Sequence, residues 1–115
     1  MSTRCNVIVQ DIDVRRRSVC AYRHTDGYPS CTGEELEYIL KNLASQNKLF
    51  FENIVTELVL TDGIFEFDGS WIHGDINFLY TITIFSNYTE FKCEAIDFNN
   101  NKEEVFTKQF IVQRE

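Results

Sequence analysis

Two His-x-Asp segments have the residue types and spacing that could support chemistry. His24 and Asp26 lie in "RHTDG", and His73 and Asp75 lie in "IHGD". On a strand, side chains two positions apart point to the same face, so each pair could offer an imidazole nitrogen and a carboxylate to one metal ion. Two such pairs together would make a metal-dependent hydrolase. We place this interpretation behind two others, because Asp-Gly-Tyr-Pro is also an ordinary turn sequence.

The chain offers little else for catalysis. Cys31 precedes a predicted helix, whose N-terminus can activate a thiol, but Glu34 and Glu35 oppose that activation and no base lies beside it. Five scattered glycines form no phosphate-binding loop. The four cysteines lack the spacing of a zinc site. We therefore predict a protein that acts without catalysis and without a metal or cofactor.

Length and composition predict one folded domain, residues 1–115. Hydrophobic residues make up 43% of the chain and aromatic residues 14%, with ten phenylalanines and five tyrosines. This content excludes disorder and favours strands. The first ten residues contain no signal core, and no apolar run is long enough to span a membrane. We therefore expect a cytoplasmic protein with no membrane association and with reduced thiols that serve as small core residues.

The net charge of −7 predicts no direct contact with nucleic acid, because such affinity comes largely from lysine and arginine. The exception to the acidic excess is the run Arg15, Arg16 and Arg17. Such a run is usually a solvated turn or strand start. The less favoured interpretation is that these arginines bind an anionic ligand.

The N-terminal half is predicted to form a hairpin followed by two helices. Residues 5–13 and 15–24 are rich in strand-forming side chains and are separated by a polar turn. Thr32 and Glu35 match the capping box of a helix start. Apolar residues at helical spacing extend that helix to near Gln46, and a second helix is expected over 48–60.

The C-terminal half is predicted to be strands. The fold class is α+β: an antiparallel sheet of about five to six strands with two helices on one face, in the order β-β-α-α-β-β-β-β. The last strand is expected at a sheet edge, where it could pair with a second copy in a homodimer. The predicted strands are residues 64–68, 76–85, 88–98 and 105–113.

Several segments also carry a family resemblance. The chain has "STR" at 2–4, "YRHTDGYP" at 22–29 and "GEEL" at 33–36, and "GDINFLYTITI" at 74–84. In these segments it resembles small accessory proteins of bacteriophages and bacterial mobile elements. Those proteins often begin with Ser-Thr-Arg, then carry a tyrosine, a spaced histidine and Trp-Asp-Gly-Tyr-Pro before a leucine-bearing helix. They have no established activity, so the resemblance implies a context in phage accessory genes and no particular reaction.

One position departs from that family pattern. Thr25 stands where the pattern usually has tryptophan, and Trp71 is the residue that could take over its role. The resemblance covers residues 1–40 well and the remainder loosely.

These observations lead to one preferred function and one main alternative. The preferred function is an anti-defence inhibitor, similar to anti-CRISPR proteins, which binds a nucleic-acid-binding defence protein of a bacterial host. The alternative is a protein that binds or sequesters a small ligand such as a nucleotide signal. The partner-binding candidates are Glu34, Glu35, Glu37, Asp62, Glu66, Asp68 and Trp71. The ligand-binding candidates are Arg4, Arg23, His24, Asp26 and Tyr28.

Overall fold

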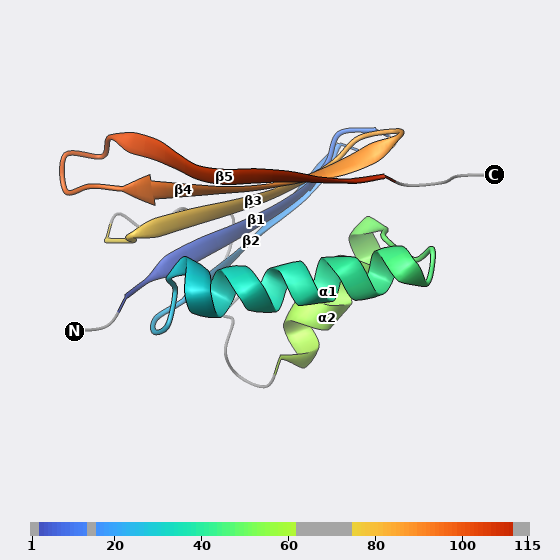
Figure 1. Cartoon of the computed structure of the whole chain (residues 1–115), viewed down its shortest axis with the longest axis horizontal. Coiled ribbons are helices and arrows are strands. Elements are labelled where there is room, and N and C mark those ends of the chain that lie inside the picture. Colours follow the sequence, from blue (N-terminus) through green and yellow to red (C-terminus); the bar gives the residue numbers. More distant parts are fainter. Residues whose placement is uncertain (1–2, 14–15, 62–74, 112–115) are drawn as a thin grey trace.

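A computed structural model describes residues 3–13, 16–61 and 75–111. The described residues form a five-stranded sheet and two α-helices, which confirms the α+β class (Figure 1). The predicted strand at 64–68 lies outside the described residues. The elements are β1 (Cys5–Asp11), β2 (Arg17–Arg23), a π-helical turn (Pro29–Gly33), α1 (Glu34–Ser45), α2 (Phe51–Leu60), β3 (Phe78–Ile84), β4 (Tyr88–Ile96) and β5 (Lys102–Ile111).

The sheet is mixed, so the prediction of a wholly antiparallel sheet was wrong. The strand order is β2-β1-β3-β4-β5, and β3 runs parallel to β1. The reason is the connection: β2 turns back beside β1, and the chain then passes through both helices before it returns on the other side of β1. Strand β2 ends beside the start of β1, where Arg23 pairs with Cys5, and β3 begins at that same end, where Phe78 also pairs with Cys5. Strand β3 therefore runs in the direction of β1 and opposite to β2. The other three strand pairs are antiparallel hairpins, as predicted.

Both helices cover one face of the sheet, as predicted (Figure 1). Helix α1 buries Leu36, Leu40 and Leu43, and this spacing forms a single helical stripe. These leucines belong to the same core cluster as the alternate residues Tyr80 and Ile82 of β3. Each large apolar side chain buried in this way contributes about 1.5–3 kcal/mol. The amphipathic pattern of α1 therefore determines which of its side chains face the solvent.

Strand β5 lies at one edge, as predicted, and its ladder with β4 contains a bulge at Val105. At the hairpin that joins β4 and β5, the Asp97 carboxylate accepts hydrogen bonds from the backbone N–H groups of Asn99 and Asn101. These bonds, that of Asn101 first, lower the pKa of Asp97.

Neither helix is long and apolar enough to cross a membrane.

Candidate functional site

The segment between β2 and α1 is locked onto the sheet at Gly27. The Gly27 N–H donates to the Thr3 carbonyl over 2.9 Å, and the Tyr80 hydroxyl donates to the Gly27 carbonyl over 2.8 Å. A Cβ at position 27 would lie 2.9 Å from the Arg4 carbonyl carbon and 2.9 Å from the Cys5 Cβ. Glycine is therefore required here by the close approach of the loop to β1. These contacts hold the loop in a fixed place beside the start of β1 and beside β3.

Arg23 points from the end of β2 toward α1. Its guanidinium donates to the Thr32 hydroxyl over 2.8 Å and to the Glu35 carboxylate over 2.7 Å. The Thr32 hydroxyl in turn donates to the Asp26 carbonyl over 2.7 Å. The predicted capping box was therefore wrong: no side chain caps α1, whose N-cap position is Gly33. The buried guanidinium engages the two side chains that would otherwise have formed the box.

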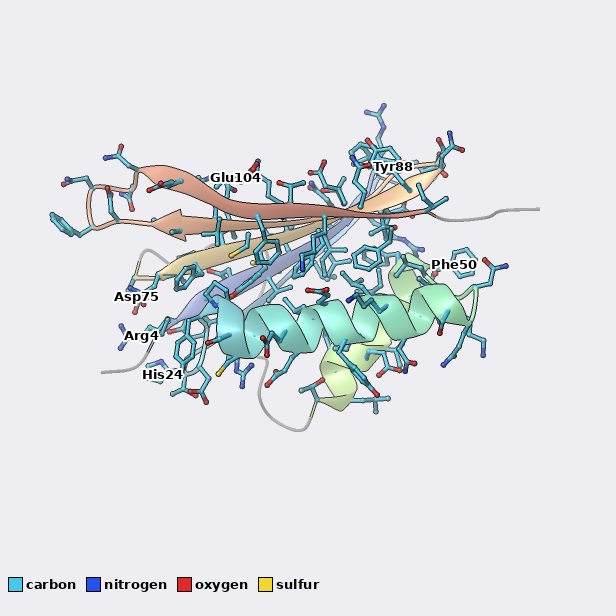
Figure 2. The ribbon with its side chains drawn as sticks, viewed as in Figure 1. Arg4, His24, Phe50, Asp75, Tyr88 and Glu104 are labelled. Atoms are coloured by element: carbon cyan, nitrogen blue, oxygen red, sulfur yellow. The ribbon has the colours of Figure 1, made fainter. Side chains whose placement is uncertain are left out.

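His24 lies in a different group, with Arg4. The Arg4 Nε donates to His24 Nδ1 over 3.3 Å, and the Tyr22 hydroxyl lies 3.1 Å from the same nitrogen. The Arg4 guanidinium also forms an ion pair with Asp75 at 3.1 Å (Figure 2). One residue from each predicted His-x-Asp pair is thus brought to the same arginine, while His73 lies outside the described residues. A guanidinium at that point repels a cation.

The side chains of the five predicted ligand-binding residues fall into three groups. Arg23 contacts the start of α1, whereas Arg4 and His24 form the separate group just described. Asp26 and Tyr28 form a third group with Cys31. A hydrogen bond with Cys31 is the main cause that raises the pKa of Tyr28, and the nearby Asp26 carboxylate adds to it. Within residues 3–13, 16–61 and 75–111, no three His, Cys, Asp or Glu side chains converge where they could hold a metal ion.

Two buried thiols are poorly suited to react. Burial raises the pKa of Cys5 to about 12 and that of Cys93 to about 11. Reactivity requires the thiolate, so both remain protonated at neutral pH. Cys5, Cys20 and Cys93 are free and buried, which confirms the prediction that they serve as core residues.

The outer surface of α1 carries the most distinct recognition feature of the described chain. Tyr38 is 71% exposed. A hollow of about 420 Å³ on one side of it is lined by Glu34, Glu35, Tyr38, Ile39 and Thr61. A second hollow, of about 290 Å³, is lined by Glu34, Glu37, Tyr38 and Lys41. We call the surface formed by Glu34, Glu35, Glu37 and Tyr38 the Tyr38 face.

Three of the predicted partner-binding residues thus come together on one surface, and one important residue was missed. Tyr38 lies two positions from both Leu36 and Leu40 of the buried stripe. At 100° per residue it is on the opposite side of the helix, which is the signal that could have identified it. The other predicted partner-binding residues, Asp62, Glu66, Asp68 and Trp71, lie outside the described residues.

The carboxylates of the Tyr38 face differ in how they are neutralised. Glu37 binds Lys108 of β5 and Lys41 of its own helix, and these hydrogen bonds, that of Lys108 first, lower the pKa of Glu37. Glu35 is bound to Arg23. In the part of the chain that the structure describes, Glu34 has no ion pair. Glu34 is therefore the carboxylate that can meet a cation of a partner.

The contact between Glu37 and Lys108 joins α1 to β5 and is expected to depend on pH. A carboxyl with a lowered folded-state pKa stabilises the fold fully above its unfolded pKa, and this contribution is lost as the pH falls through the folded value. We expect Glu37→Gln to reduce the free energy of unfolding by about 0.5–1 kcal/mol near neutral pH. Urea denaturation should show this difference shrinking as the pH falls through the lowered pKa of Glu37. Glu103→Gln, at an exposed position on β5, is the control and should show no such change; an equal loss in both variants contradicts the assignment.

The candidate site is thus a recognition surface on α1 supported by the fixed joint at Gly27. No protein-family model, curated protein or solved structure matches this chain.

Proposed function

We propose that this protein acts by binding, without catalysis, and that it inhibits a basic protein by covering its surface with the Tyr38 face. The observation that carries the proposal is the exposed aromatic ring between two hollows, both of which include Glu34. Exposed tyrosines are frequent energetic anchors of protein interfaces. The flanking hollows give partner side chains a place to pack beside the ring.

Charge supports a basic partner. The chain has 18 acidic and 11 basic residues, and complementary charge accelerates association and excludes wrong partners. The binding energy itself would come mainly from Tyr38. Glu34, which has no ion pair with another described residue, provides a carboxylate beside it. A groove that normally holds nucleic acid is a basic surface of the required kind.

The resemblance to phage accessory proteins extends this proposal to a class of partner. The partner would be a nucleic-acid-binding defence protein of a bacterial host, and the protein would act in the host cytoplasm. Its carboxylates would occupy the groove in place of phosphates.

The test is capture from a host lysate with the tagged chain, followed by affinity measurement on the purified pair. Tyr38→Ala is expected to weaken binding by about tenfold or more. Phe98→Ala is the matched control, because Phe98 is a highly exposed aromatic residue on the hairpin between β4 and β5. It should bind as the wild type does.

A charge pair completes the design. Glu34→Lys should weaken binding, and Glu103→Lys, which makes the same change in net charge on β5, should have little effect. Capture of no basic protein contradicts the proposal. Equal losses in Tyr38→Ala and Phe98→Ala also contradict it, because the Tyr38 face would then have no special role.

A further inference from the structure

The exposed edge of β5 has a sequence that reads the same in both directions by residue class. Residues 105–111 are Val-Phe-Thr-Lys-Gln-Phe-Ile. Around the central lysine, polar residues lie at one step, phenylalanines at two steps and aliphatic residues at three steps. A two-fold interface requires a surface that is complementary to itself, and an antiparallel strand pair places opposite ends of this segment together.

Among the described residues this edge is unpaired, and it exposes apolar side chains as well as charged ones. Strand β5 is last in the order β2-β1-β3-β4-β5, and no described strand pairs with its outer side (Figure 1). Val105 is 45% exposed and Ile111 is 73% exposed. A long edge strand with exposed apolar side chains is a template for pairing with another chain.

We infer that two copies of this chain form a dimer in which their β5 strands pair antiparallel about a two-fold axis at Lys108. Residues directly opposite each other in such a pair point to the same face, so the register must match faces as well as ends. An axis at Lys108 places Phe106 opposite Phe110. It also places the exposed Val105 of one copy opposite the exposed Ile111 of the other, twice in the dimer.

The bulge explains why the axis belongs at Lys108. Val105 is the extra residue in the ladder with β4, so alternation along β5 is interrupted there. A register that extends pairing to Glu103 or Glu104 would cross this interruption and bring together residues of opposite faces. The stretch 106–111 lies on one side of it, and an axis at Lys108 keeps the pairs of Phe106 with Phe110 and of Thr107 with Gln109 within that stretch.

The like charges at the axis are already compensated. Two lysines directly opposite each other would repel, but Lys108 forms an ion pair with Glu37 of its own α1. Each copy thus brings a neutralised lysine to the axis. This gives Glu37 a second role that the packing of a monomer would not require.

The test is sedimentation equilibrium of the full chain over a dilution series. The wild type is expected to show a species of twice the 13.5 kDa chain mass. Val105→Lys and Ile111→Lys should each raise the dimer dissociation constant by about tenfold or more, because each introduces two charges into the pairing. Val59→Lys is the matched control: Val59 is an exposed valine on α2 and should dimerise as the wild type does.

Two further variants sharpen the result. Glu37→Gln should weaken the dimer, because it leaves two uncompensated lysines at the axis. Tyr38→Ala should leave it unchanged, so failure of the dimer and failure of the proposed function are separate outcomes. A wild type that stays monomeric at all soluble concentrations overturns the inference. A dimer that survives both β5 substitutions, or that Val59→Lys dissociates equally, also overturns it.

Discussion

Replacing Gly27 with alanine is expected to lower the free energy of unfolding by about 3 kcal/mol, the upper part of the range for overpacked sites. The new methyl group would lie 2.9 Å from the Arg4 carbonyl carbon and 2.9 Å from the Cys5 Cβ. Neither atom is the end of a flexible side chain. Relief therefore requires the loop to move away from β1, which would stretch the hydrogen bonds that Gly27 makes with Thr3 and Tyr80. Urea denaturation monitored by circular dichroism measures the loss.

Gly33→Ala is the matched control for this prediction. A Cβ at Gly33 would make only ordinary contacts of 3.5 Å with Pro29 and with the Tyr80 ring. The Gly33 backbone is helical, with φ of −58°, so alanine there should be neutral or should stabilise by up to about 1 kcal/mol. If both alanine variants are equally stable, the close approach at Gly27 is not a constraint on the fold.

Only part of the fold could be predicted from the sequence. The turn residues and the helical and strand periods are local signals, and they located the three hairpins, both helices and the edge position of β5. They could not show that β3 lies parallel beside β1, because strand neighbours depend on which side of the sheet the chain returns to. A pattern within a strand does not contain that information.

The candidate site could likewise be predicted only in part. The carboxylates of α1 were predicted to bind a partner. Glu34 is exposed beside Tyr38, whereas Glu35 and Glu37 are half-buried and form ion pairs with other elements. The residues of the predicted ligand corner divide into separate side-chain groups, because Arg23 and His24 are adjacent at the end of β2, where successive side chains point in opposite directions. Arg23 therefore contacts α1, whereas His24 contacts Arg4. Closeness in sequence does not by itself place two side chains in one group.

The direction of Arg23 leads to the second large effect. Its side chain is only 7% exposed and holds β2 to the start of α1 through Thr32 and Glu35. Arg23→Met keeps much of the side-chain volume but removes both hydrogen bonds. We expect a loss of about 2–3 kcal/mol, because hydrogen bonds of charged groups are worth about 1.5–3 kcal/mol and Glu35 can recover part of its solvation. Chemical denaturation at neutral pH measures this loss.

A second arginine separates burial from charge. Arg4→Met removes the hydrogen bond to His24 and the ion pair with Asp75. Both contacts are accessible to solvent, so the change should cost less than about 1 kcal/mol. In a double-mutant cycle, Arg23→Met and Glu35→Gln should be non-additive because the two groups are in direct contact. Equal effects of the two arginine variants, or additivity in the cycle, would mean that the bond between β2 and α1 does not hold the helix. The Tyr38 face lies on the first turns of α1, where Arg23 binds Glu35. Other contacts would then have to hold this part of the helix in place.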